Sequence, residues 1–191
     1  MQLDPASGWC QGVLVCRSPN FNARPSGEIS LLVIHNISLP PAQFATGKVQ
    51  EFFQNRLDVT EHPYFAGIAD LRVSAHFLIE RDGTVTQFVS CLERAWHAGV
   101  SSFEGRETCN DFSVGIELEG TDDLPFEDAQ YQALTTLTRQ LQSTFTAITA
   151  QRICGHSDIA PGRKTDPGPA FDWARYRAAL AKAALEQEEQ R

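Results

Sequence analysis

Residue types that can bind a metal and stabilise charge gather on one glycine- and proline-rich segment, residues 155–168. This segment carries His156, Lys164 and Asp166. A loop of this composition is not held by a regular hydrogen-bond ladder, so its polar side chains are candidates for function. His and Asp are good ligands for a divalent zinc ion, and a Lys is a mobile positive charge suited to a developing oxyanion. A further ligand is needed, and His35, at the end of an apolar run, is the obvious supplier.

Each of these residues also has a purely structural interpretation. Taken alone, His35 at a strand end is more often a hydrogen-bonded core histidine than a ligand. Asp166 precedes a Pro-Gly pair and can simply organise a turn. Lys164 can be an ordinary surface residue. Asp158 is a rival ligand to Asp166, although its position two residues after His156 favours a role in shaping the loop.

Length and charge limit the class of protein. The chain has 191 residues, which fits one domain that buries roughly 70% of its unfolded surface. Hydrophobic residues make up 42% and charged residues 21%, as in ordinary globular proteins. A net charge of −8 without a long basic run argues against nucleic acid or an anionic membrane as the partner. An anionic substrate would have to meet local positive charge.

The N-terminus and the cysteines bear on localisation. Residues 1–9 lack a basic segment followed by an apolar core, so we expect no secretory signal, and no apolar run approaches the about 20 residues that span a bilayer. We therefore expect a cytoplasmic monomer. An odd number of cysteines without C-x-x-C spacing fits reduced thiols; they are Cys10, Cys16, Cys91, Cys109 and Cys154. Cys154, in an apolar stretch, is expected to be a small buried residue.

The hydrophobic pattern predicts an α/β fold. The apolar run at 29–34 is expected to be a central strand covered on both faces. Asp82-Gly83 between two β-prone runs is a strong hairpin signal. Two Gly/Pro breaks suggest that residues 56–73 form a loop over one edge of the sheet. The expected elements of this first part are strands at 12–16 and 29–34, a helix at 48–55, and hairpin strands at 74–80 and 84–89.

The second half predicts one alternating strand and two helices. In residues 111–119 every second residue is apolar, which turns Glu117 away from the apolar side of the strand. Residues 127–145 carry apolar side chains at helical spacing after an acidic start. Asp172 is the expected N-cap of a second helix, which ends in a polar tail. No repeat or linker divides the chain, so we expect one domain over 1–191, with a core at about 9–180 and a polar end at 181–191.

Six motifs carry a family resemblance by their order along the chain. They resemble those of the zinc-dependent N-acetylmuramoyl-L-alanine amidases, over about residues 9 to 176, and six motifs in order are more specific than any one. The resemblance implies a mixed β-sheet with helices packed on it, in agreement with the pattern above. The motifs are residues 33–36, 74–77, 82–84, 95–99, 110–117 and 155–168.

The resemblance also implies roles for individual residues. It assigns one zinc ion per chain to His35, His156 and Asp166, which leaves a fourth position for water. Glu117 would take a proton from the zinc-bound water and deliver it to the leaving nitrogen, and Lys164 would stabilise the oxyanion. An Asp as third ligand is expected of the cytosolic recycling branch, whereas other amidases of this family carry a Cys there.

That branch cleaves the bond between 1,6-anhydro-N-acetylmuramic acid and the L-alanine of the stem peptide. The resemblance therefore implies a muropeptide substrate, peptidoglycan recycling and an effect on β-lactamase induction. Trp96 is a candidate platform for the sugar, with core packing about equally expected, and His97 is expected in the cleft wall. Because the stem peptide is rich in carboxylates, the candidates that hold it are Arg72 and Arg106, with Asn36 at the muramoyl-peptide junction.

Two other functions remain as alternatives. A binding-only module on the same fold would lack a zinc ligand, whereas the chain has the whole set implied by the resemblance. A broader wall-lytic amidase would carry an export signal or wall-binding repeats, and neither is visible in the sequence. A zinc peptidase with a His-Glu-x-x-His motif is excluded, since that motif is absent.

His76, within an alternating stretch, is a further possible ligand but fits a packed or hydrogen-bonded histidine better.

Overall fold

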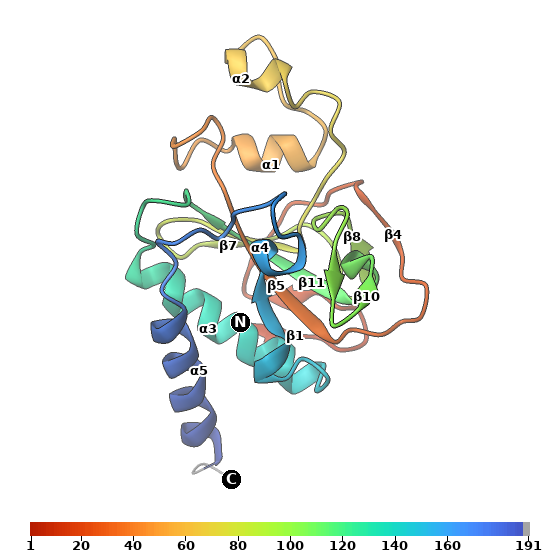
Figure 1. Ribbon diagram of the computed structural model, residues 1–191, viewed down its shortest axis with the longest axis vertical. Helices are drawn as coiled ribbons and strands as arrows, with labels where there is room; N and C mark the ends of the chain where they lie inside the picture. Colours follow the sequence, from red (N-terminus) through yellow and green to blue (C-terminus); the bar gives the residue numbers. More distant parts are fainter. Residues whose placement is uncertain (189–191) are drawn as a thin grey trace.

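A six-stranded mixed β-sheet forms the centre of the structure (Figure 1). The computed structural model describes residues 1–188. The first four strands across the sheet are parallel, the fifth is antiparallel to the fourth, and the sixth is parallel to the fifth. In this order they are β12 (Ile153–Gly155), β5 (Leu31–Ile37), β11 (Ser113–Glu119), β6 (Phe77–Ile79), β7 (Val85–Gln87) and β3 (Leu14–Val15). The predicted mixed sheet flanked by helices is confirmed.

Strand β5 lies inside the sheet, as its apolar run predicted. It pairs with β12 on one side and β11 on the other, and its residues from Leu31 to His35 are buried. The strand expected at 12–16 is shorter than predicted. Only β3 forms there, and Leu14 and Val15 are 59% and 53% exposed. β3 is the edge strand with a single partner, so β-prone side chains alone did not bring it into the core.

The predicted hairpin is confirmed with shorter strands. β6 and β7 pair antiparallel, with Leu78 opposite Thr86. In the connecting turn the Asp82 side chain accepts a hydrogen bond from the Thr84 N–H at 2.8 Å. Gly83 takes a φ of 85° and its Cα approaches the Ala129 carbonyl too closely for a Cβ. The turn therefore needs glycine for its conformation and for its contact with the next helix.

Two long helices cover one face of the sheet (Figure 1). They are α3 (Asp128–Thr144) and α5 (Trp173–Glu188). The predicted stripe of α3 is buried against Leu32 and Ile34 of β5 in one apolar cluster. The predicted N-cap of α5 is confirmed, because Asp172 Oδ1 accepts the Arg175 N–H at 2.9 Å. The last residues of the expected polar end, 189–191, lie outside the described residues.

The opposite face carries shorter elements. α1 (Lys48–Phe53) matches the helix expected at 48–55. Residues 56–73, expected to be a loop over one sheet edge, instead contain α2 (Pro63–Ala66) and pack with α1 against Leu78 of β6. Figure 1 shows α1 and α2 together on the side of the sheet away from α3. The reason is local and apolar: His62 caps a helix that starts at Pro63, and burial of Phe65 holds the segment on the sheet face.

Short pairs and turns complete the fold. None of the described helices is long and apolar enough to cross a membrane. The remaining elements are β1 (Gln2–Leu3) with β2 (Cys10–Gln11), β4 (Phe21–Ala23) with β8 (Glu93–Ala95), β9 (Ser102–Phe103) with β10 (Arg106–Glu107), the 3-10 turns η1 (Cys109–Asp111) and η2 (Ala150–Arg152), and α4 (His156–Ile159).

Candidate functional site

Three neighbouring parallel strands bring the candidate residues to one edge and one face of the sheet. His35 lies near the carboxyl end of β5, directly opposite Glu117 of β11. His156 follows β12, whose Gly155 is opposite Ile34. Because side chains alternate along a strand, β5 and β11 send their core residues toward α3 and turn His35 and Glu117 to the other face. The carboxyl ends of parallel strands are a common location for binding sites.

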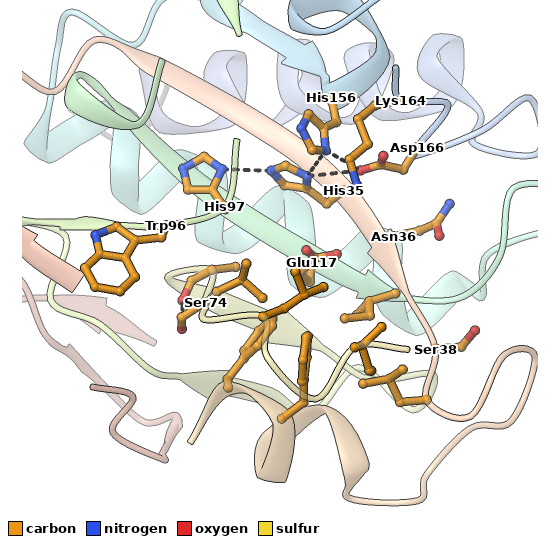
Figure 2. A pocket seen from close by; sticks show the side chains of 18 of the residues that line it. His35, Asn36, Ser38, Ser74, Trp96, His97, Glu117, His156, Lys164 and Asp166 are labelled. Atoms are coloured by element: carbon orange, nitrogen blue, oxygen red, sulfur yellow. Dashed lines mark hydrogen bonds and ion pairs between the residues drawn. The ribbon is translucent and has the colours of Figure 1, made fainter. Parts of the chain in front are cut away.

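Three ligand atoms converge at this point (Figure 2). The Nδ1 atoms of His35 and His156 lie 3.0 Å apart, and each is 3.0 Å from Oδ2 of Asp166. Both histidines are buried, with 1% and 3% exposure. The structure thus brings together the three residues that the sequence proposed as metal ligands.

The chemistry of these atoms fits a divalent metal ion. His156 Nε2 lies 3.0 Å from the Ala98 carbonyl, which only accepts hydrogen bonds, and 3.4 Å from the Arg163 guanidinium, which only donates. The carbonyl contact is the shorter one, and Arg163 itself donates to this carbonyl, so we assign the proton to Nε2 and a lone pair to Nδ1. A proton on His35 Nδ1 would satisfy one contact with Asp166, whereas a divalent cation between the three atoms satisfies all of them. Two nitrogens and one carboxylate oxygen are a donor set that suits zinc and leaves a position open.

The ionisation of the ligands agrees with this fit. Burial lowers the pKa of His35 to about 4, so its ring is neutral at neutral pH, as a metal ligand must be. For Asp166, burial acts to raise the pKa. Hydrogen bonds from His156 and His35 and their charges outweigh burial, and the pKa of this carboxyl falls well below its usual value. Asp166 is therefore a carboxylate.

Glu117 lies in the same cavity without a hydrogen-bond partner for its Oε2 atom, which is buried. Burial raises the pKa of Glu117 well above its usual value, the charge of Asp166 raises it further, and the charge of Lys164 acts in the opposite direction. The cavity has a volume of about 370 Å³. A buried carboxyl group that lines such a cavity is a typical general acid or base. Glu117 is only 9% exposed, so it is not a solvated surface residue.

Hydrogen bonds hold the loop that carries Asp166. The backbone carbonyl of Asp166 accepts the Ser157 N–H at 2.9 Å. The side-chain amide of Asn36 donates to the Pro167 carbonyl at 3.1 Å and to Asp122 Oδ1 at 2.7 Å. Asn36 thus supports the ligand loop as well as lining the cavity. Asp158 accepts the Gly155 N–H at 2.7 Å, so it shapes the loop, as predicted, and is not among the converging ligand atoms.

The other predicted residues divide into two groups by location. Lys164, Trp96 and His97 line the cavity, and Trp96 Nε1 donates to Asn22 Oδ1 at 2.6 Å. Arg72 and Arg106 do not line it. Arg72 donates to the carbonyls of Ala69 and Leu71, and Arg106 pairs with Glu28 at 2.7 Å and covers the Phe112 ring. His76 is buried and accepts the Gly115 N–H, which confirms its structural interpretation.

An apolar wall of the cavity was not predicted. Tyr64, Ile68 and Leu71, from the segment expected to be a plain loop, line the cavity together with the metal-ligand residues. Tyr64 and Leu71 remain 46% and 49% exposed. The signal in the sequence was the density of apolar residues in a segment without regular periodicity. Such residues in a loop indicate a packed or binding surface more than a solvated connection.

Comparisons with known proteins find amidases that are similar over most of the chain. A family model described as N-acetylmuramoyl-L-alanine amidase matches residues 25–169. The protein named 1,6-anhydro-N-acetylmuramyl-L-alanine amidase AmpD is 55% identical in Citrobacter freundii over 178 residues, which is 93% of this chain and 95% of the relative. Its Haemophilus influenzae counterpart is 58% identical over 165 residues, 86% of this chain and 90% of the relative.

Solved structures give the same result. A crystal structure of a selenomethionine AmpD derivative superposes with a TM-score of 0.91 at 55% identity, covering 94% of this chain and 99% of the other. The AmiD amidase of E. coli, in complex with anhydro-N-acetylmuramic acid-L-Ala-D-gamma-Glu-L-Lys, superposes with a TM-score of 0.59 at 32% identity, over 79% of this chain and 57% of the other. With its matching family model, near-complete coverage and shared fold, the chain belongs to the N-acetylmuramoyl-L-alanine amidase family.

Proposed function

We propose that this protein hydrolyses the amide bond between 1,6-anhydro-N-acetylmuramic acid and the L-alanine of the stem peptide, in peptidoglycan recycling. The single observation that carries the proposal is the cavity in which the His35, His156 and Asp166 ligand atoms converge beside the unpartnered Oε2 of Glu117. Relatives that are named for this anhydro substrate support the proposal, and they match this chain over nearly their whole length.

The proposed metal ligands are His35, His156 and Asp166, which would hold one zinc ion per chain. When bound, a zinc ion supplies Lewis-acid activation of the scissile carbonyl and of the attacking water. The protein contributes the geometry. Short contacts among the three ligand atoms and the buried positions of both imidazoles mean that little has to move when the ion binds.

Glu117 and Lys164 are the proposed catalytic residues. The carboxylate of Glu117 accepts a proton from the attacking water, and the resulting carboxylic acid returns it to the leaving alanine nitrogen. The Lys164 ammonium group, on the same loop as Asp166, stabilises the charge that develops on the carbonyl oxygen. Both interactions strengthen as the transition state forms, so they act on turnover more than on binding.

The proposed substrate contacts follow the cavity wall. His97 contacts His35, and Trp96 lines the same cavity as the apolar residues Tyr64, Ile68 and Leu71. Trp96 is the proposed sugar platform, because an indole face covers the apolar side of a pyranose. Asn36 remains a candidate at the muramoyl-peptide junction. Arg72 and Arg106, which do not line the cavity, stay predictions for binding the peptide carboxylates.

The proposed compartment is the cytoplasm. All five cysteines are free thiols, in agreement with a reducing compartment. An effect on β-lactamase induction is a further consequence that we expect from removal of anhydromuropeptides. The alternative of a binding-only module is disfavoured by Glu117, because a module that only binds has no need of a buried carboxyl group without a partner.

Turnover of matched substrates tests this proposal. We expect about one zinc per chain and release of the stem peptide from anhydromuropeptides, with slower release from the non-anhydro N-acetylmuramoyl counterparts. Chelation and the variant Asp166→Ala should each abolish release, and added zinc should restore only the chelated parent protein. Undiminished hydrolysis by Asp166→Ala would overturn the mechanism. Equal turnover of both substrates would replace the recycling function by that of a broader wall-lytic amidase.

A further inference from the structure

One short segment contacts both proposed histidine ligands on the side away from the metal position. Nε2 of His156 donates to the Ala98 carbonyl at 3.0 Å. Nε2 of His35 lies 2.9 Å from Nδ1 of His97, the residue before Ala98. The distal nitrogens of two imidazoles from different strands are thus bound by two consecutive residues. The position of this segment therefore affects both ligands at once.

The direction of these hydrogen bonds is fixed by their ends. If His35 binds the metal through Nδ1, its Nε2 carries the proton and donates to His97 Nδ1. His97 then carries its own proton on Nε2, which lies 3.1 Å from the Ser113 hydroxyl. In this series of hydrogen bonds, from His35 through His97 to Ser113, each contact pairs one donor with one acceptor. Hydrogen bonds to the second nitrogen set the tautomer of a metal-binding histidine and orient its ring.

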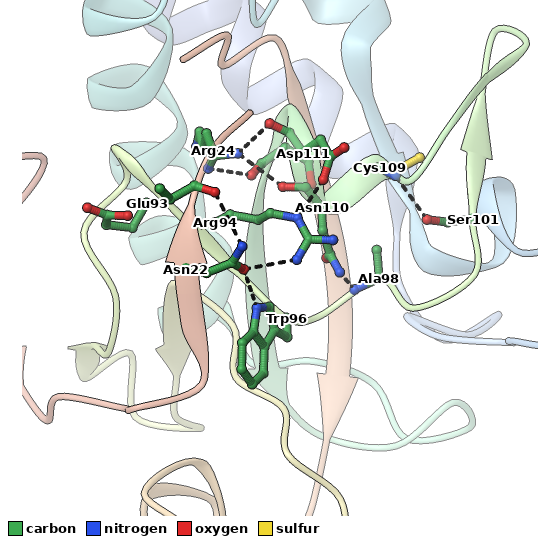
Figure 3. A network of polar contacts seen from close by, with 12 residues as sticks. Asn22, Arg24, Glu93, Arg94, Trp96, Ala98, Ser101, Cys109, Asn110 and Asp111 are labelled. Atoms are coloured by element: carbon green, nitrogen blue, oxygen red, sulfur yellow. Dashed lines mark hydrogen bonds and ion pairs between the residues drawn. The ribbon is translucent and has the colours of Figure 1, made fainter. Parts of the chain in front are cut away.

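Asn110 holds the segment in place (Figure 3). Its Oδ1 atom accepts the N–H groups of His97 at 3.1 Å and Ala98 at 2.8 Å. Asn110 is 5% exposed, and its own carbonyl accepts a hydrogen bond from the buried guanidinium of Arg24 at 3.1 Å. Asn110 is not among the cavity-lining residues. One oxygen atom outside the cavity therefore anchors both residues that contact the ligands.

Packing leaves the His97 ring no alternative position on the sheet side. A Cβ at Gly115 of β11 would lie 2.5 Å from the His97 ring, so the ring packs directly on the strand backbone. Arg163 also donates to the Ala98 carbonyl, at 2.6 Å, but its side chain reaches there from an exposed residue of the ligand loop. The anchor inside the protein is the side chain of Asn110.

We infer that Asn110 is a positioning residue for the metal site: through the backbone of residues 97–98 it fixes the Nε2–H tautomers of His35 and His156 and directs their Nδ1 atoms at the metal. This inference rests on the proposed function, since it requires that these histidines bind the metal. Asn110 itself touches neither the metal position nor the cavity. Replacing Asn110 should therefore change the affinity for zinc directly, and turnover only as a consequence.

Zinc affinity of the full chain, measured by competition with a chromophoric chelator, tests the inference. Asn110→Ala removes the acceptor, and we expect the dissociation constant for zinc to rise about 10- to 100-fold, the effect of losing an outer hydrogen-bond partner of a metal ligand. Asn110→Asp keeps oxygen acceptors at the same place and should restore affinity close to that of the parent. If Asn110 only stabilised the fold, Asn110→Ala and Asn110→Asp would bind zinc with equal affinity whenever both are equally folded.

Asn22 offers a matched control in the same network. Its Oδ1 accepts hydrogen bonds from Arg94 and from Nε1 of Trp96, the residue before the segment, whereas the hydrogen bonds to the His97 and Ala98 N–H groups come from Asn110. Asn22→Ala should leave zinc affinity unchanged. Equal affinities for Asn110→Ala and the parent would overturn the inference, provided that circular dichroism shows both to be folded.

A measurement on the parent protein covers the case in which Asn110→Ala does not fold. In ¹⁵N-labelled, zinc-loaded protein, long-range ¹H–¹⁵N spectra should show His35 and His156 both protonated on Nε2. Coordination through Nε2 in either histidine would overturn the inference even if zinc is bound. If the parent binds no zinc, the proposed function fails instead, so the two failures are distinguishable.

Discussion

At the scale of single residues, the site depends on polar groups kept in costly surroundings. Glu117 has one oxygen without a partner, and burial together with the charge of Asp166 raises its pKa. Such a group destabilises the folded protein and persists where it has a function. Lys164, by contrast, is exposed and reaches the cavity from the loop that also supplies Asp166. The proposed catalytic and ligand groups therefore share one loop and two strand ends.

Replacing Glu117 by Gln tests its role as a proton acceptor. We expect turnover of the anhydromuropeptide to fall by about 10² to 10⁴, the usual contribution of general acid–base catalysis, with little change in KM. Steady-state kinetics with chromatographic detection of the released peptide measures both values. Zinc content should stay the same, which separates this outcome from loss of the metal. An unchanged turnover would remove Glu117 from the mechanism.

At the scale of elements, alternation along two strands explains why the polar groups meet. β5 and β11 are parallel and in register, so His35 faces the same side as Glu117 whenever their apolar neighbours face α3. A shift of one residue in either strand would send the ligand into the core. The helix α5 seals that core from the far side, and its start next to the ligand loop is fixed by Asp172.

Removal of this N-cap is the test at the first turn of α5. Asp172→Ala should lower the free energy of unfolding by about 0.5–2 kcal/mol, since the Arg175 N–H loses its acceptor. Urea denaturation followed by circular dichroism measures the change. Asp172→Asn, which retains a capping oxygen, should lose much less. If both variants unfold alike, the side chain does not cap the helix.

His76, just before β6, makes the stability of the sheet depend on pH. Burial lowers its pKa to about 3, and the charge of Arg24 acts in the same direction, so the folded protein keeps this ring neutral. The unfolded chain binds a proton at a pKa of about 6.5. The contribution of the neutral His76 ring to the free energy of unfolding is therefore fully present above about pH 6.5 and is lost as the pH falls toward 3.

The variant His76→Gln isolates this dependence. Denaturation at a series of pH values should show that the free energy of unfolding of the parent decreases more steeply below about pH 6.5 than that of the variant. The difference between the two curves is the measurement, because the carboxyl groups contribute equally to both. Parallel curves would mean that His76 is not held neutral in the folded protein.

At the scale of the whole molecule, the proposed metal joins segments that are distant in the chain. His35 is separated from His156 by 121 residues and from Asp166 by 131. A ligand that binds only the folded protein stabilises it by mass action. The proposed ion would therefore link β5, the end of β12 and the following loop, besides its proposed part in the reaction.

Removal of the metal should consequently lower the melting temperature. We expect the chelated protein to melt below the zinc-loaded protein, and the melting temperature to rise again with zinc concentration in excess of the site. Scanning calorimetry measures both. The variant Asp166→Ala should show almost no response to zinc. An identical response in the parent and in Asp166→Ala would place the stabilising ion elsewhere in the protein.

Local chemistry determined a large part of this protein from the sequence alone. The apolar run of β5, the alternation in β11, the spacing in α3 and the Asp-Gly turn each depend on near neighbours in the chain, and each was predicted correctly. Residue types suggested His35, His156 and Asp166 as ligands, and the resemblance of ordered motifs favoured this role over their structural interpretations. Local pattern failed at β3 and in residues 56–73, where coverage by the rest of the fold decided burial.

Only the tertiary structure decided how these residues act together. That Glu117 keeps a free oxygen, that His97 meets His35 across 62 residues, and that Asn110 anchors residues 97–98 are consequences of packing between strands and loops far apart in the chain. The sequence determined which donors and acceptors were available, because these are properties of the side chains. The fold determined which of them face each other, because hydrogen bonds depend on distance and direction in space.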